Sequence, residues 1–269
     1  TAYEMLRSLV GSEMCIRDRM TYLIVVLFGF VFGSFLNVLI HRLPLSISLV
    51  NPVGSTCPHC DHRIKWYENI PVFSYLFLKG KCSNCSASIS IIYPIVEIIT
   101  AIVTLMIYLN FLWNWDLIAI TALFYTLIVL SFIDLKYRAV PDYLLIIAVV
   151  LAIIVGDLVS LLIFTGGLVL LELAITFYIQ NIKAKITGNK ELETQRALGE
   201  GDMPIAGVIG GLLGIQLGVS AIFLAALLAL LPAIYNLLSK KEIETAFIPF
   251  LSLGLFITLF SGFNLFSLF

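Results

Sequence analysis

Apolar runs long enough to cross a membrane recur along this chain and limit what it can fold into. They begin near Thr21, Ile89, Trp115, Asp142, Leu158, Pro204, Leu217 and Ile248. A membrane-spanning helix needs about 20 mostly apolar residues. With 60% hydrophobic and only 12% charged residues, the chain carries more apolar surface than a soluble domain of 269 residues buries. We therefore predict an all-α, polytopic membrane helix bundle with about eight transmembrane helices.

The basic residues predict the orientation of this bundle. The chain contains 16 Lys and Arg residues, and all those that follow Met20 fall on one side of the membrane if there are eight spans. The opposite turns carry Asp116, Asp157 and uncharged residues. Because cytoplasmic loops are enriched in Lys and Arg, we expect both termini outside and four basic loops in the cytoplasm.

The first 19 residues differ from the rest of the chain. They are polar and mixed in charge, and they lack the order of charged, apolar and small-residue regions of a signal peptide. We interpret residues 1–19 as a non-native leader, with a genuine disordered tail as the alternative, and leave Cys15 out of any site. The sequence then predicts a first transmembrane helix at 20–39, a cytoplasmic four-Cys module at 40–88 and a transmembrane domain at 89–269.

Two CxxC pairs stand in the predicted module. They are Cys57 with Cys60, and Cys82 with Cys85. Two such pairs can complete a tetrahedral zinc site, and metal binding would replace the hydrophobic core that a small loop lacks. Disulfides or free thiols are the alternatives, but a cytoplasmic loop is reducing. We predict a structural zinc ion held by the four cysteines, without His59 or His62.

Two aspartates stand where predicted helices meet the cytoplasmic side. Asp134 ends the third apolar run, and Asp202 closes Gly199-Glu200-Gly201-Asp202 before the sixth. Two carboxylates close together share one proton, and such a pair can hydrolyse a peptide bond without a metal. Alternatively, Asp202 is a helix N-cap and Asp134 an interfacial residue beside Lys136. Asp142, which follows Pro141, is expected to be the N-cap of the fourth helix.

Seven pieces of the sequence follow the order found in one family. They are Gly33-Ser34-Phe35-Leu36-Asn37-Val38 with His41-Arg42-Leu43-Pro44; the double CxxC loop; Glu68-Asn69-Ile70-Pro71; Tyr93-Pro94-Ile95-Val96-Glu97; Asp134 with Pro141-Asp142; Gly199-Glu200-Gly201-Asp202; and Ile248-Pro249-Phe250. With these pieces the chain resembles the type IV prepilin peptidases, which are similar to other GxGD intramembrane aspartyl proteases.

This resemblance implies an aspartyl peptidase in the 89–269 domain, with Asp134 and Asp202 as the catalytic pair. Gly199, Gly201, Asp142 and Glu97 would be supporting or substrate residues. The implied activity is cleavage of the short basic leader of prepilins or pseudopilins after a Gly, at the cytoplasmic face of the bacterial inner membrane. S-adenosylmethionine would then methylate the new N-terminus, and the proteolytic step would need no cofactor.

Some features remain outside this interpretation. The family usually has Lys two residues after the second Asp, where this chain has Pro204. Glu172 is predicted inside a span without a specific role, and no residue identifies a methyl-donor site. Two interpretations stay open for the acidic residues Glu191, Glu193 and Glu200. They would attract the basic leader of a prepilin, or they belong to an ordinary solvated loop. We expect membrane lipid and no nucleic acid as partners, and the oligomeric state stays open. The rival functions are a proton-coupled transporter and a non-catalytic zinc-ribbon scaffold.

Overall fold

The computed structural model describes residues 2–49, 54–57, 59–111, 115–187, 198–239 and 245–268. Within these ranges, the side chains of residues 2–18, 115 and 268 are not described. The chain forms two compact units, Thr1–Leu117 and Ile118–Phe269. In the described ranges the elements are helices, and β-structure is limited to two isolated bridges. The predicted all-α class is therefore confirmed.

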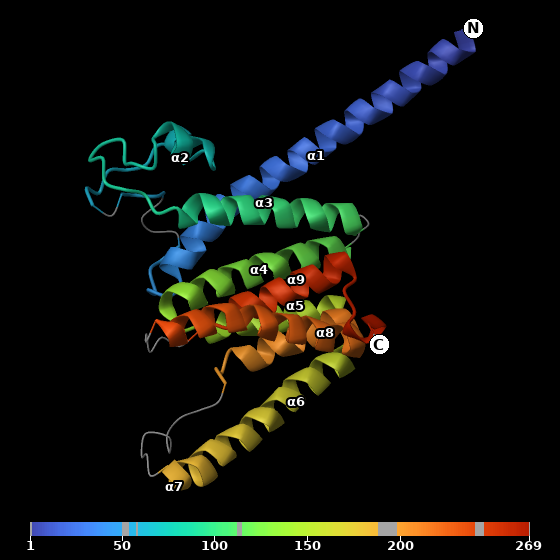
Figure 1. Cartoon of the computed structure of the whole chain (residues 1–269). Helices are drawn as coiled ribbons and strands as arrows, with labels where there is room; N and C mark the ends of the chain where they lie inside the picture. Colours follow the sequence, from blue (N-terminus) through green and yellow to red (C-terminus); the bar gives the residue numbers. More distant parts are fainter. Residues whose placement is uncertain are drawn as a thin grey trace. The chain divides into compact units, whose positions relative to one another are not determined.

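Two long helices form the frame of the first unit. The elements are α1 (Ala2–Arg42), η1 (Trp66–Asn69), α2 (Phe73–Phe77) and α3 (Ile92–Asn110). α1 and α3 pack together, as Figure 1 shows. A Cβ atom on Gly29 would lie 2.6 Å from the Cα of Ala101, so glycine permits this close approach. The backbone of 2–19 belongs to α1, and the interpretation of that segment as a non-native leader stays a prediction.

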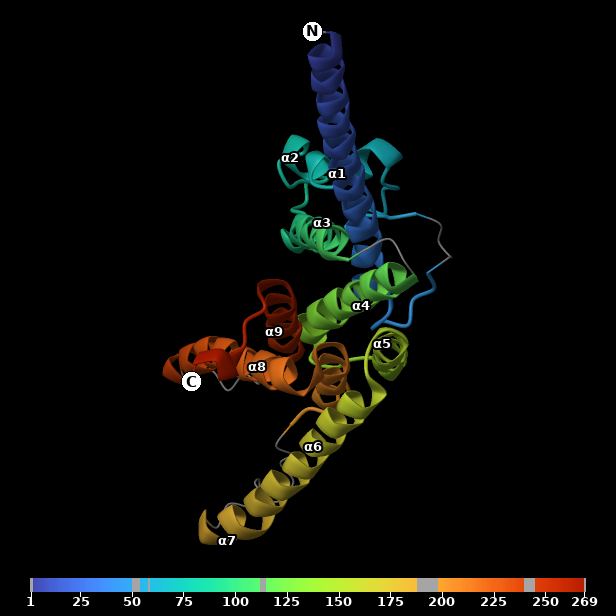
Figure 2. The same cartoon turned by 90° about the vertical axis from the view of Figure 1, so that its right-hand side faces the viewer.

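The second unit contains the remaining long helices. They are α4 (Trp115–Tyr137), α5 (Asp142–Val155), α6 (Leu158–Phe177), the π-helix η2 (Tyr178–Lys183), α7 (Ala184–Thr187), α8 (Asp202–Leu238), α9 (Ile248–Ser261) and η4 (Leu265–Leu268). α8 packs against both α6 and α9. η2 and α7 continue from the end of α6, and α7 lies away from α4 and α9 in both views (Figures 1 and 2).

The apolar core of the second unit lies among α4, α8 and α9. Its fully buried side chains include Leu123, Leu127, Leu130, Ile133, Ile205, Ile209, Leu251 and Leu255. The ring of Phe124 in α4 contacts those of Phe256 and Phe260 in α9. Since α4 is the most deeply buried of the candidate spans, polar groups near its end are held in a packed environment.

Five described helices are long and apolar enough to cross a membrane. They are Arg19–Arg42, Ile92–Asn110, Asp116–Tyr137, Leu158–Ile186 and Asp202–Leu238. α5 and α9 are apolar but shorter. Inside α8, Gly214 has a φ of 70°, and this break divides the helix near the expected boundary between the sixth and seventh apolar runs. The protein is a multi-pass membrane protein, and the number of eight spans stays a prediction.

Two basic loops fall partly outside the described residues. They contain Lys190, Arg196, Lys240 and Lys241. The predicted domain boundaries at 39, 88 and 89 also stay predictions. The two compact units of the structure meet after Leu117.

Candidate metal centre and aspartate pair

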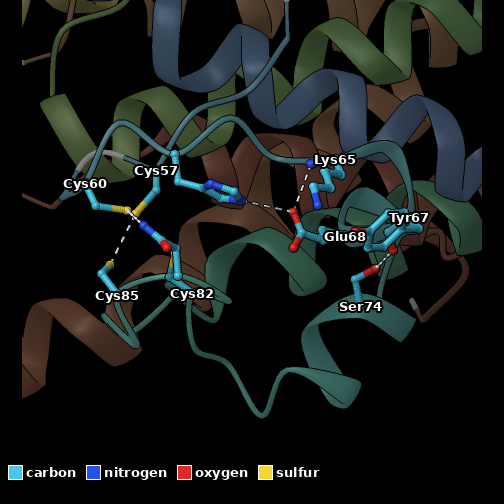
Figure 3. Close-up of polar contacts among 10 residues, drawn as sticks. Cys57, Cys60, Lys65, Tyr67, Glu68, Ser74, Cys82 and Cys85 are labelled. Atoms are coloured by element: carbon cyan, nitrogen blue, oxygen red, sulfur yellow. Dashed lines mark hydrogen bonds and ion pairs between the residues drawn. The ribbon is translucent and has the colours of Figure 1, made fainter.

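The four cysteines of the CxxC pairs come together in the first unit (Figure 3). Their Sγ atoms all lie within 4.8 Å of one another. The Sγ atoms of Cys57 and Cys85 are 3.8 Å apart, and those of Cys60 and Cys82 are 4.0 Å apart. None of the four forms a disulfide, so the disulfide alternative is wrong for this structure.

Each CxxC pair is carried by a turn of the same construction. In the first turn, the N–H of Cys57 donates to the carbonyl of His62, and the N–H of Asp61 donates back to Cys57. The second turn repeats both bonds 25 positions further along, at Cys82, Ser86 and Ala87. Asp61 and Ser86 both have a positive φ, of 52° and 58°. Each turn thus holds its two cysteine sulfur atoms with the same backbone geometry as the other turn.

The sulfur positions fit a zinc ion. A Zn–S bond is about 2.3 Å long, so two sulfurs of a tetrahedral site lie about 3.8 Å apart. The shorter sulfur–sulfur separations of the cluster agree with this value. Soft thiolate ligands in a tetrahedron are typical of zinc, and four of them leave no position for a substrate or water.

Hydrogen bonds within the turns favour the thiolate form, which is the form that binds metal, at Cys82 and Cys60. The backbone N–H groups of Cys85 and Asn84 lower the pKa of the Cys82 thiol to about 6. The backbone N–H of His62 and the side chain of Asn84 lower the pKa of the Cys60 thiol. In contrast, although the backbone N–H of Ala87 lowers the pKa of the Cys85 thiol, the contacts with the Cys60 and Cys82 sulfurs outweigh it and this pKa is raised to about 12. As expected, neither His59 nor His62 belongs to the cluster.

A second polar group stands beside this cluster. The Nε2 atom of His62 lies 3.7 Å from Oε2 of Glu68, which also accepts the backbone N–H of Lys65 at 2.9 Å. Figure 3 shows Glu68 and Lys65 on the same side of the module as Tyr67 and apart from the cysteines. His62 therefore connects the first turn to η1 rather than to the metal position.

A cavity of about 490 Å³ lies next to the cluster within the first unit. Its walls come from the C-terminal part of α1, the N-terminal part of α3 and the segment that carries the cysteines. Cys57 and Cys82 line it together with Asn37, Tyr93 and Glu97. The metal cluster therefore forms part of the cavity wall.

Glu97 ties three parts of this unit together. Its side chain, only 7% exposed, accepts the backbone N–H of Val72 at Oε2, with a distance of 2.7 Å. The Ser34 side chain of α1 also bonds to this carboxylate. Val72 has a φ of 60°, a costly conformation for a β-branched residue that tends to persist only where the surroundings hold it. Glu97 thus links α1, α3 and the cysteine-bearing segment.

Asp134 and Asp202 come together in the second unit. Asp134 lies near the C-terminal end of α4, and Asp202 is the first residue of α8. Each is 8% exposed, and they lie close enough for the charge of Asp134 to act on Asp202. Two buried carboxylates that feel each other's charge do not both ionise at low cost, so the arrangement favours a shared proton.

Backbone N–H groups hold both carboxylates. Oδ2 of Asp134 accepts the N–H of Ile248, the first residue of α9, at 3.3 Å. Oδ2 of Asp202 accepts the N–H of Gly199 at 3.2 Å. A Cβ atom on Gly199 would lie 3.0 Å from that same oxygen, and one on Gly201 would lie 3.2 Å from the end of the Ile248 side chain. There is therefore little room for a side chain at either glycine, next to the aspartate pair.

Two aspartates that the sequence allowed as helix N-caps, Asp202 and Asp142, do not cap their helices in the structure. The N-cap of α8 is Gly201, and the Asp202 carboxylate bonds backward to Gly199 instead of capping the helix. The N-cap of α5 is Pro141, and Asp142 is an exposed first residue of that helix. Pro204 is the third residue of α8, within the first turn, where proline does not break a helix.

The predicted site residues fall into two groups. Asp134, Asp202, Gly199 and Gly201 belong to the second unit, and the four cysteines and Glu97 belong to the first. Asp142 is exposed and makes no capping bond, while Glu191 and Glu193 lie outside the described residues. Sequence reasoning missed the N–H groups of Ile248 and Val72, because a backbone donor leaves no signature in residue identity.

Comparisons with known proteins agree with this division. The family model described as the bacterial peptidase A24 N-terminal domain matches residues 27–111, and that of the type IV leader peptidase family matches residues 121–234. The chain is 32% identical to the prepilin leader peptidase/N-methyltransferase of Aeromonas hydrophila, over 84% of this chain and 85% of the relative. It is 32% identical to the protein of the same name from Pseudomonas aeruginosa, over 88% and 89%. No solved structure matches the chain.

Proposed function

Since this chain belongs to the type IV leader peptidase family, we propose that it is a membrane aspartyl endopeptidase that removes the short basic leader of prepilins or pseudopilins. The observation that carries this proposal is the pair of buried carboxylates, Asp134 and Asp202, at two helix ends. Cleavage follows a Gly of the leader at the cytoplasmic face of the bacterial inner membrane. The name of the relatives supports a second activity, N-methylation of the new N-terminus.

The aspartate pair supplies both an acid and a base for hydrolysis. The ionised carboxylate takes a proton from water, and the water oxygen bonds to the carbonyl carbon of the substrate. The protonated carboxyl donates its proton to the carbonyl oxygen. The C–N bond then breaks as the departing amine takes a proton from the pair. The backbone donors at Ile248 and Gly199 keep each carboxylate in place through these steps.

The surroundings of the pair suit a substrate that enters near the membrane surface. Both aspartates lie at helix ends instead of in the middle of a span. Gly199 and Gly201 carry no side chains, so the loop before α8 offers its backbone to a peptide at these two positions. A proton-coupled transporter would more often place its carboxylates near mid-membrane, in discontinuous helices.

Methylation needs a donor and the free amine that cleavage creates. S-adenosylmethionine would supply the methyl group to the amine nitrogen, and the amine would release a proton to water. The four cysteines would hold a structural zinc ion that stabilises the cytoplasmic module. Neither reaction passes through this metal.

Purified full-length protein in detergent, mixed with a prepilin, tests the proposal. Cleavage after the leader Gly by the unchanged chain, together with its loss in Asp202→Ala, supports it. A chain that leaves every prepilin and pseudopilin uncut would overturn the peptidase. A transporter or a zinc-ribbon scaffold would leave the prepilin uncut. A methylated peptide, detected by mass spectrometry, would support the N-methyltransferase activity.

A further inference from the structure

The cavity beside the cysteines is large enough for a nucleoside-containing ligand. Its volume is about 490 Å³, and pockets that enclose small ligands typically measure about 300 to 1,000 Å³. All of its walls belong to the first unit, so it is complete without the aspartate pair. The proposed proteolysis gives no role to this space.

The cavity combines groups of opposite charge with apolar walls. Glu97 stands on one side, and Arg42 stands at the end of α1, where its guanidinium also donates to the backbone carbonyls of Ser48, Leu49 and Gly54. Apolar side chains such as Ile64, Ile70 and Leu78 complete the lining. This combination suits a ligand that has charged and hydroxyl groups as well as a flat heterocycle.

Glu97 retains capacity for a ligand. A carboxylate has about four positions at which it accepts hydrogen bonds, and the bonds from Val72 and Ser34 use two of them. The side chain is buried but lines the cavity. A buried carboxylate with open acceptor positions binds cationic groups and ribose hydroxyls well.

We propose that this cavity binds S-adenosylmethionine, with Glu97 as the residue that recognises its hydroxyl or cationic groups. The inference rests on the proposed N-methylation and names the place of its donor. S-adenosylmethionine carries a sulfonium, an amino-acid group and an adenosine, which match the acid, the base and the apolar walls. A pilin N-terminus is the rival occupant, and competition by S-adenosylhomocysteine distinguishes the donor from it.

The metal cluster shapes the same cavity. Cys57 and Cys82 contribute to its wall, and their sulfur atoms lie within 4.8 Å of those of Cys60 and Cys85, at the position where a metal would hold the two turns together. Loss of the metal would therefore deform the donor site directly. The aspartate pair belongs to the other unit and uses no residue of this wall.

Binding of radiolabelled S-adenosylmethionine to the purified full-length protein in lipid nanodiscs tests the inference. We expect one saturable site per chain, competed by S-adenosylhomocysteine. Glu97→Gln should weaken binding by about tenfold or more, because a hydrogen bond to a charged group is lost. Glu172→Gln is the matched control, since Glu172 is also a buried glutamate of a membrane helix but lies in α6 of the other unit. This control should bind normally.

A second measurement keeps the test decisive if Glu97→Gln fails to fold, which its zinc content and melting temperature would show. Ultraviolet cross-linking attaches the labelled donor to the unchanged protein, and peptide mapping should find the label within residues 34–97. A label within 118–269, equal binding by Glu97→Gln that retains zinc, or no binding at all would overturn the inference. A chain that cleaves prepilin but gives one of these results would keep the peptidase proposal intact. A chain that binds the donor at 34–97 but cleaves nothing would overturn only the peptidase.

Discussion

At the scale of single residues, the two candidate aspartates differ from the other acidic side chains by what surrounds them. Asp134 and Asp202 are buried, feel each other's charge and accept backbone N–H bonds. Asp142 is exposed and Asp157 caps α6 through the N–H of Ser160. Position in the fold, more than residue type, separates the proposed catalytic pair from these others.

Asp134→Asn and Asp202→Asn should each reduce prepilin cleavage by about 10² to 10⁴ fold, because an amide neither takes nor donates the proton that the reaction moves. Initial rates with a purified prepilin measure this effect. Asp116→Asn makes the same chemical change at the opposite end of α4 and should keep its rate. Near-normal turnover in either of the first two variants would remove that residue from the mechanism.

Gly199→Ala should lower the turnover number by up to about 10² fold, since small displacements of a catalytic group have effects of this size. The added methyl would lie 3.0 Å from Oδ2 of Asp202 and would shift the carboxylate. Gly166→Ala, at a helical position with no atom within 4 Å, is the control for the glycine-to-alanine change. Equal turnover in both variants would show that Asp202 tolerates the displacement.

At the scale of elements, small residues determine how closely the helices of the second unit approach. Gly156 follows α5, and a Cβ atom there would collide with the carbonyl oxygen of Gly211 in α8. That oxygen also accepts the N–H of Asp157 at 2.8 Å. The turn between α5 and α6 is thereby fixed against α8, the helix that begins with Asp202.

Gly156→Ala should destabilise the protein by about 1 to 3 kcal/mol, because the methyl meets a backbone atom that has no room to move. Thermal unfolding in detergent, followed by fluorescence, measures the loss. Gly167→Ala lies in open space inside α6 and should be neutral or stabilising by up to about 1 kcal/mol. A melting temperature unchanged by Gly156→Ala would contradict the packing described for this turn.

The two cysteine turns are needed together for the metal site, since each turn alone provides only two of the four ligands. Cys82→Ser should lower bound zinc from one ion per chain to well below one and destabilise the module, because structural zinc contributes about 10 to 16 kcal/mol of binding energy in small metal domains. Metal analysis of the purified protein measures the ratio. Cys15→Ser, at the fifth cysteine of the chain, should leave the zinc content at one. Metal-free preparations that keep the same melting temperature would refute a structural zinc ion.

At the scale of the whole molecule, the orientation of the chain depends on whether α5 crosses the membrane. Its 14 residues extend about 21 Å, which is short for a hydrocarbon layer of about 30 Å. Crossing would place the turn at Asp157 opposite the loop at Arg138. It would also keep the basic loops on one side, as the distribution of Lys and Arg predicts.

Reporter fusions decide this point. Alkaline phosphatase fused after Asp157 should be active and that fused after Arg138 inactive, because the enzyme works only outside the cytoplasm. Green fluorescent protein at the same positions should give the reverse result. The same reporter response at both positions would mean that α5 does not cross, and the predicted count of spans would then be wrong.

The sequence alone predicted the all-helical class and the four-cysteine cluster. Apolar runs and CxxC spacing are local patterns, and the physical requirements of a membrane and of a metal ion leave few alternatives for them. It also singled out Asp134 and Asp202 as the candidate catalytic pair, through the order of short motifs, and that role stays a prediction. It wrongly allowed Asp202 and Asp142 to be helix caps, since capping residues and functional aspartates look alike before a helix.

Only the tertiary structure decided which distant groups meet. The approach of Asp134 to Asp202, the N–H of Ile248 on the first of them and the bond from Val72 to Glu97 join residues far apart in the chain. Such contacts follow from how whole helices pack, and packing depends on the combined shape of many side chains. A cavity is likewise a property of several surfaces at once, so no single stretch of sequence predicts it.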